Sequence, residues 1–60
     1  MTDTPKATAV IADDEPALAQ ALQRHLASLW PGLTIAAVAR NGLEAATAIR
    51  ELAPDVAFLD

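Results

Sequence analysis

The stretch Ala7–Pro16, ATAVIADDEP, decides the fold. Ala7–Ala12 is a short apolar run with a Val-Ile pair, and it ends abruptly at Asp13. This length and composition predict a strand that is buried on both faces. The acids before Pro16 predict a helix start, because Asp caps helices, Pro suits the first helical position and carboxylates favour the positive end of the helix dipole. The stretch is interpreted as a strand that leads through an acidic turn into a helix.

Two further elements follow in the same manner. A helix is predicted from Pro16 to Leu29, because its apolar residues recur at helical spacing. Trp-Pro-Gly at 30–32 ends it, since the residue before a proline leaves the helical region. Leu33–Ala39 is a second apolar run and predicts a second strand. On this placement Trp30 should lie at the end of the sheet opposite the acids.

The remaining residues predict a second helix and a third strand. Asn41-Gly42 could close a hairpin, but Leu43–Ala53 is rich in Ala, Glu, Leu and Arg with apolar residues at helical spacing. We therefore expect Asn41 to start a helix and Pro54 to stop it. Asp55–Asp60, DVAFLD, is predicted as a third strand that ends in an acid.

The alternation of strands and helices predicts an α/β fold with a parallel sheet and right-handed crossovers. The class expected is a flavodoxin-like, doubly wound sheet, of which this chain carries strand–helix–strand–helix–strand. Ligands of such sheets sit beyond the carboxyl ends of the strands, where the strand order reverses. If the first and third strands are neighbours, as in flavodoxin-like order, Asp13, Asp14 and Glu15 converge with Asp60.

Convergence of these carboxylates points to a metal ion. Two carboxylates about 4 Å apart repel by roughly 4 kcal/mol at an effective dielectric constant near 20. No basic residue close in sequence neutralises them. Clustered oxygen ligands without imidazole or thiolate favour Mg²⁺, with Mn²⁺ as the alternative, over zinc. An aspartate can also form an acyl phosphate, and Asp60, alone at its strand end, is the candidate nucleophile.

Composition limits the classes of function. The chain has 60 residues, a net charge of −4 and no cysteine. The charge argues against nucleic-acid or anionic-membrane binding by this segment, and no apolar stretch approaches the roughly 18 to 20 residues of a membrane span. Residues 1–6 are polar and lack a signal-peptide pattern, so they are predicted to be a disordered lead-in. A cytoplasmic location is expected.

The three motifs VIADDEP (10–16), ARNGLEA (39–45) and PDVAFLD (54–60) together resemble the receiver domain of bacterial response regulators. The resemblance covers nearly all of residues 7–60 and implies that they are the N-terminal part of such a domain, cut at the end of its third strand. Two further strands and three further helices would follow. The resemblance implies a phosphoryl-accepting switch with self-catalysed transfer, not an enzyme with turnover.

The resemblance also implies roles for single residues. Asp60 falls at the position of the phosphoacceptor aspartate, and Asp14 at that of a direct Mg²⁺ ligand. Asp13 falls at the second acidic position, which usually acts through water, while the role of Glu15 is left open. The implied donor is a phosphohistidine on a sensor histidine kinase.

ADDEP, with Leu-Trp-Pro at the end of the first helix, is most similar to receivers joined to a LytTR-type DNA-binding output domain. This similarity implies transcription regulation through a domain beyond the chain, with a homodimer formed on phosphorylation as one arrangement.

Other interpretations remain open at the sequence level. The chain could be part of a pseudo-receiver, a binding or dimerisation module that uses no phosphoryl group. An aspartyl-phosphate phosphatase is a further alternative, although such enzymes usually carry a D-x-D spacing after the first strand, whereas Asp13 and Asp14 are adjacent. The acids at 13–15 could simply cap a helix. Asp55 is expected to be a turn acid at the opposite end of the sheet. His25 is expected on the core-facing side of the first helix, in a packing or partly exposed structural role.

Overall fold

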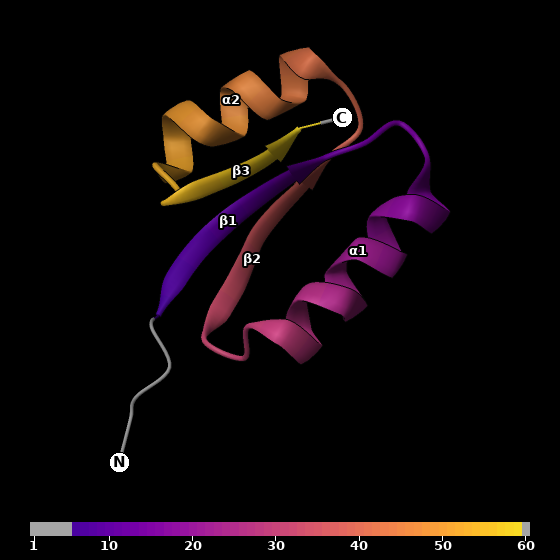
Figure 1. Cartoon of the computed structure of the whole chain (residues 1–60). Helices are drawn as coiled ribbons and strands as arrows, with labels where there is room; N and C mark the ends of the chain where they lie inside the picture. Colours follow the sequence, from indigo (N-terminus) through magenta and orange to yellow (C-terminus); the bar gives the residue numbers. More distant parts are fainter. Residues whose placement is uncertain (1–5, 60) are drawn as a thin grey trace.

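The computed structural model describes residues 6–59. Its elements are β1 (Ala7–Ala12), α1 (Pro16–Leu29), β2 (Leu33–Ala39), α2 (Gly42–Leu52) and β3 (Val56–Leu59). The strands form one parallel sheet in the order β2-β1-β3 (Figure 1). The predicted α/β class is confirmed: the chain forms part of a flavodoxin-like fold, and its first and third strands are neighbours.

The core is centred on β1, the middle strand. Ala9, Val10 and Ile11 are fully buried and Ala12 is 7% exposed, as predicted for a strand covered on both faces. Figure 1 shows α1 and α2 on opposite sides of the sheet; α2 contacts β1 and β2, and α1 contacts β2. Each buried Val or Ile stabilises the fold by about 1.5–3 kcal/mol relative to leaving it exposed. This burial holds the carboxyl end of β1 in a fixed place.

The first helix has the predicted bounds. Pro16 stands in its first turn, and the Trp30 N–H donates to the Leu26 carbonyl at 2.7 Å. The Leu33 N–H in turn donates to the Trp30 carbonyl at 3.0 Å, so Trp30 lies beside the start of β2, at the end of the sheet opposite Asp13.

The prediction that His25 faces the core is wrong, because its side chain is exposed. The sheet-facing side of α1 carries Ala19, which is buried, with Leu22 and Leu26 half-buried. At about 100° per residue these three positions fall close together around the helix. His25 lies roughly a quarter turn from their centre, which places it toward solvent.

The second helix begins at Gly42 with Asn41 as its N-cap, which confirms the prediction that Asn41 starts a helix. It ends at Leu52, and Ala53 is its C-cap in the left-handed conformation with φ 46°. The third strand is shorter than predicted because Asp55 lies in a bend rather than in β3. Asp60 and the first five residues of the predicted lead-in lie outside the described residues, and Lys6 is exposed.

Between residues 6 and 59, no helix combines the length and the apolar character that crossing a membrane requires.

Candidate functional site

The carboxyl ends of β1 and β3 lie side by side. Ala12 pairs with Leu59 in the parallel register, and these are the residues that precede Asp13 and Asp60 in the sequence. Asp13 is held at the end of β1 because its N–H donates to the Ala39 carbonyl at 3.0 Å. Asp60 itself lies outside the described residues. The described pairing of β1 with β3 therefore extends to Leu59, the residue before the predicted phosphoacceptor.

The acidic turn after β1 does not act as a side-chain helix cap. Asp13 Oδ1 accepts the Glu15 N–H at 2.9 Å, which closes a local turn. Glu15 is the N-cap residue of α1 but makes no side-chain cap hydrogen bond. The amides of Leu18 and Ala19 bond instead to the Glu15 backbone carbonyl, each at 3.1 Å. Capping by an acid side chain, one of the sequence-level alternatives, therefore does not explain this cluster.

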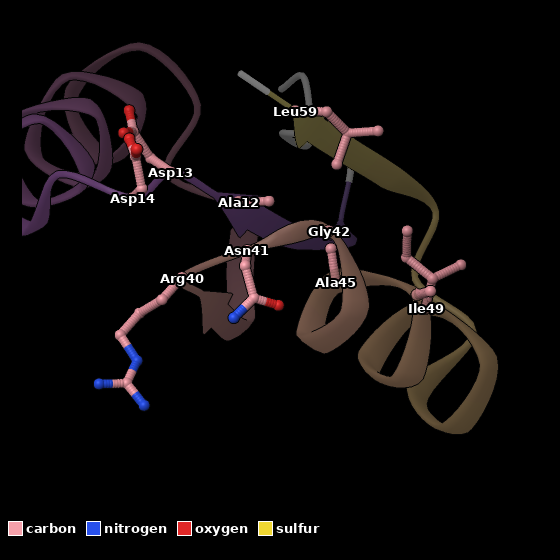
Figure 2. A pocket seen from close by; sticks show the side chains of 10 residues that line it. Ala12, Asp13, Asp14, Arg40, Asn41, Gly42, Ala45, Ile49 and Leu59 are labelled. Atoms are coloured by element: carbon pink, nitrogen blue, oxygen red, sulfur yellow. The ribbon is translucent and has the colours of Figure 1, made fainter.

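Asp14 is the least constrained of these acids. Its side chain is exposed, and within residues 6–59 no hydrogen bond or ion pair reaches its carboxylate. Figure 2 shows Asp13 and Asp14 directly after the end of β1. Within residues 6–59, Asp13 Oδ1 is the one oxygen of the two carboxylates that accepts a backbone N–H. Most of their oxygen lone pairs therefore remain free for a ligand.

A hollow of about 580 Å³ opens at this end of the sheet. Its walls come from the end of β1, the β2–α2 loop, the inner side of α2 and the end of β3. The lining residues are Ala12, Asp13, Asp14, Arg40, Asn41, Gly42, Ala45, Ala46, Ile49 and Leu59. Figure 2 shows the acids on one side of this hollow and the apolar side chains of α2 and β3 on the other. The site combines an anionic corner with an apolar floor.

Arg40 lines the same hollow but is engaged elsewhere. Its guanidinium pairs with Glu44 at 3.5 Å, is 78% exposed, and is directed away from Asp13 and Asp14 in Figure 2. An exposed pair of this kind contributes little to stability. Between residues 6 and 59, no ion pair therefore neutralises the carboxylates of Asp13 and Asp14.

Glu44 and Asn41 cap the start of α2. Asn41 Oδ1 accepts the Glu44 N–H at 2.8 Å, and Glu44 Oε1 accepts the Arg40 N–H at 3.0 Å. This backbone hydrogen bond is the main reason that the pKa of Glu44 lies below its usual value; the Arg40 guanidinium adds to the effect, and desolvation opposes it. The cap role of Asn41 is confirmed. Glu44 was missed, although an acid three residues after an N-cap is a known signal.

The donor set suits a hard cation. Within the described part of the chain, no group of three or more His, Cys, Asp and Glu side chains is placed to hold a metal ion. Asp13 and Asp14 form a pair, and Asp60, the third predicted ligand, lies outside that part. Carboxylate oxygens without imidazole or thiolate are what Mg²⁺ takes, and Mg²⁺ commonly needs only one or two carboxylates with water and phosphate oxygens. The residues present fit such an ion.

Asp55 lies at the opposite end of the sheet, as predicted, but its partner was not foreseen. Its carboxylate Oδ2 accepts the Thr8 N–H at 2.8 Å. Thr8 stands 47 residues earlier in the chain. No local pattern in the sequence signals this contact.

A parallel sheet of order β2-β1-β3, with paired acids at the carboxyl end of its central strand, defines the flavodoxin-like α/β class of protein. Within that class, the chain is 57% identical over 53 residues to an uncharacterized response regulatory protein of Vibrio cholerae serotype O1. The match covers 88% of this chain, but the chain spans only 20% of that relative's length. This similarity supports a receiver domain of the response-regulator kind, in agreement with the three sequence motifs. No family model and no solved structure matches the chain.

Proposed function

We propose that this chain is the N-terminal part of the receiver domain of a two-component response regulator, and that it accepts a phosphoryl group on Asp60. The observation that carries the proposal is the pairing of Ala12 with Leu59, because it brings the residues before Asp13 and before Asp60 to the same edge of the sheet. The similarity to a response regulatory protein supports the same function.

The chain's own residues supply ligands and a nucleophile. Asp14 would hold Mg²⁺ directly, Asp13 would act through a bound water, and Asp60 would complete the ligand set. Asp13 suits the indirect role because its Oδ1 already accepts the Glu15 N–H. Bound Mg²⁺, or Mn²⁺ in its place, neutralises the negative charge shared by carboxylates and phosphoryl oxygens.

The transfer itself is a displacement at phosphorus. An oxygen of Asp60 attacks the phosphorus of a phosphohistidine on a sensor histidine kinase, and an acyl phosphate forms as the P–N bond breaks. The kinase imidazole keeps the electron pair of the P–N bond and takes up one proton from solvent, so it leaves as a neutral histidine side chain. The product is a switched state of the protein rather than a released compound, so the chain belongs to a self-catalysed switch and not to an enzyme with turnover.

The switch would act on an output domain elsewhere in the full-length protein. We extend the proposal to a LytTR-type DNA-binding output that regulates transcription in the cytoplasm, with dimerisation on phosphorylation. The sequence ADDEP and the Leu-Trp-Pro end of α1 support this finer assignment.

Phosphorylation of the full-length protein tests the proposal. With acetyl phosphate and Mg²⁺, the wild-type protein should incorporate one phosphoryl group that is labile to hydroxylamine. Asp60→Asn should abolish incorporation, while Glu51→Gln, a change at an exposed α2 residue, should leave it unchanged. Labelling of Asp60→Asn at the wild-type level would remove Asp60 from this role.

A further inference from the structure

Asp55 and Thr8 form a reciprocal set of hydrogen bonds at the amino-terminal end of the sheet. The Thr8 N–H donates to Asp55 Oδ2 at 2.8 Å, and the Asp55 N–H donates to the Thr8 carbonyl at 2.9 Å. The Thr8 hydroxyl lies 3.4 Å from the same Oδ2 and 3.3 Å from the Asp55 nitrogen. Among the side-chain hydrogen bonds between residues 6 and 59, only these tie β1 to the segment that leads into another strand.

Side-chain packing specifies the register of β3 only weakly. The strand has four residues, of which Val56 and Phe58 are half-buried while Ala57 and Leu59 are exposed. Leu59 is 65% exposed. Register is strongly specified only where one face of a strand is buried, so a short strand of this kind needs another determinant.

The two pairings of β1 differ in regularity. Its register with β2 shifts between Ala9 and Val10. Its register with β3 runs without a shift from the pair Ala9–Val56 to the pair Ala12–Leu59. The unshifted pairing begins directly after the bonds between Asp55 and Thr8. The Asp55–Thr8 contact therefore precedes all the residue pairs between β1 and β3, and it can set their alignment.

Alignment at this end decides the position of the acids at the other end. A parallel strand rises about 3.3 Å per residue, so a slip of two residues, which keeps the same side chains on each face, moves the last residue by roughly 6.6 Å. Mg²⁺ holds its oxygen ligands at about 2.0–2.1 Å and tolerates little deviation from octahedral geometry. Such a slip would take the Asp60 carboxylate out of reach of an ion on Asp14.

We infer that Asp55 is a positioning residue for phosphoryl transfer: its carboxylate, bonded to the Thr8 amide, fixes the β1–β3 register that pairs Leu59, the residue before Asp60, with Ala12, the residue before Asp13. The inference rests on the proposed function for its catalytic consequence. The claim that Asp55 controls the register between β1 and β3 does not depend on phosphorylation.

The test compares three variants of the full-length protein. Asp55→Ala removes the acceptor of the Thr8 N–H, whereas Asp55→Asn keeps a side-chain oxygen in the same place. Ala27→Gly, in the exposed interior of α1, is the control for a loss of stability that leaves β1 and β3 untouched. Two quantities are measured: the rate constant of phosphorylation by acetyl phosphate at saturating Mg²⁺, and the amide NMR contacts between Ala12 and Leu59.

Asp55→Ala is expected to slow phosphorylation about tenfold and to weaken the Ala12–Leu59 contacts, because small misplacements of reacting groups cost rates of this order. Asp55→Asn should restore the rate to within about twofold of wild type, since the amide oxygen still accepts the Thr8 N–H. Ala27→Gly should keep both the wild-type rate and the contacts.

Wild-type contacts and a wild-type rate in Asp55→Ala would overturn the inference, as would an equal loss of rate in Ala27→Gly. Failure of the proposed function looks different, because the wild-type protein would then take no phosphoryl group at all. In that case the NMR contacts still decide whether Asp55 sets the register.

Discussion

The two ends of the sheet use aspartate in opposite ways. At the amino-terminal end, Asp55 Oδ2 accepts the Thr8 N–H at 2.8 Å and so links β1 to the segment that leads into β3. At the carboxyl end, Asp14 has no hydrogen-bond or ion-pair partner within residues 6–59, and Asp13 uses one oxygen for a local turn. The same residue type stabilises the fold at one end and stays available for a ligand at the other. Hydrogen-bond partners, rather than residue type, separate the structural acid from the candidate ligands.

The largest effect expected from this difference concerns Mg²⁺. Asp14→Ala should lower the Mg²⁺ affinity of the full-length protein by about tenfold or more, because direct carboxylate ligation is lost. The affinity is measured by titration calorimetry, with Glu51→Gln as the control. Unchanged affinity in Asp14→Ala would favour the pseudo-receiver interpretation over a phosphoryl-accepting one.

Stability without metal sharpens the comparison. Asp55→Ala should lower the free energy of unfolding by about 1.5–3 kcal/mol, the range for a hydrogen bond to a charged group. Asp14→Ala should leave it unchanged or raise it slightly, since that carboxylate has only a neighbouring acid to repel it. Urea unfolding in the presence of EDTA measures both. Equal destabilisation by Asp55→Ala and Asp14→Ala would contradict the difference in role between the acids at the two ends of the sheet.

A smaller effect is expected in the loop that leads to Asp55. Ala53 adopts φ 46°, a left-handed conformation in which a Cβ atom is unfavourable. Ala53→Gly should therefore raise the free energy of unfolding by about 0.5–1 kcal/mol, after allowing for the greater freedom of glycine in the unfolded chain. Ala48→Gly, within α2, should lower it by about 1 kcal/mol. A loss of stability in Ala53→Gly would contradict this account of the helix end.

The smallest effect concerns Glu44, a hydrogen-bonded acid at the start of α2. Its folded-state pKa is lowered from 4.5, chiefly by the Arg40 backbone N–H. A lowered pKa means that Glu44 contributes stability above its unfolded pKa, and that this contribution is lost as the pH falls through the folded pKa. Glu44→Gln should therefore flatten the pH dependence of stability below about pH 4.5. Unfolding curves for both proteins between about pH 3 and 6 give the comparison.

Sequence patterns predicted the elements better than the contacts between them. β1, α1 and β2 have the predicted bounds because buried runs, helical spacing and proline each act over a few residues. The sequence left open whether β1 and β3 are neighbours, because strand order depends on packing between distant segments. The Thr8–Asp55 contact spans 47 residues and has no local signal.

The candidate site divides in the same way. Asp13 and Asp14 were predicted from the abrupt end of an apolar run, and the structure places both in the hollow beside Leu59. The role of Asp60 stays a prediction. His25 was misplaced because the first helix is apolar over a broad arc, so spacing alone did not decide which side faces the sheet.

Relaxation by a paramagnetic ion tests the central claim most directly. With Mn²⁺ in place of Mg²⁺, NMR line broadening in the full-length protein falls off steeply with distance from the metal. The amide signals of Asp14 and Leu59 should broaden together and most strongly, while those of Thr8 and Trp30, toward the far end of the sheet, should broaden much less. Broadening of Thr8 as strong as that of Asp14, or of Asp14 without Leu59, would show that no cation is shared between the ends of β1 and β3.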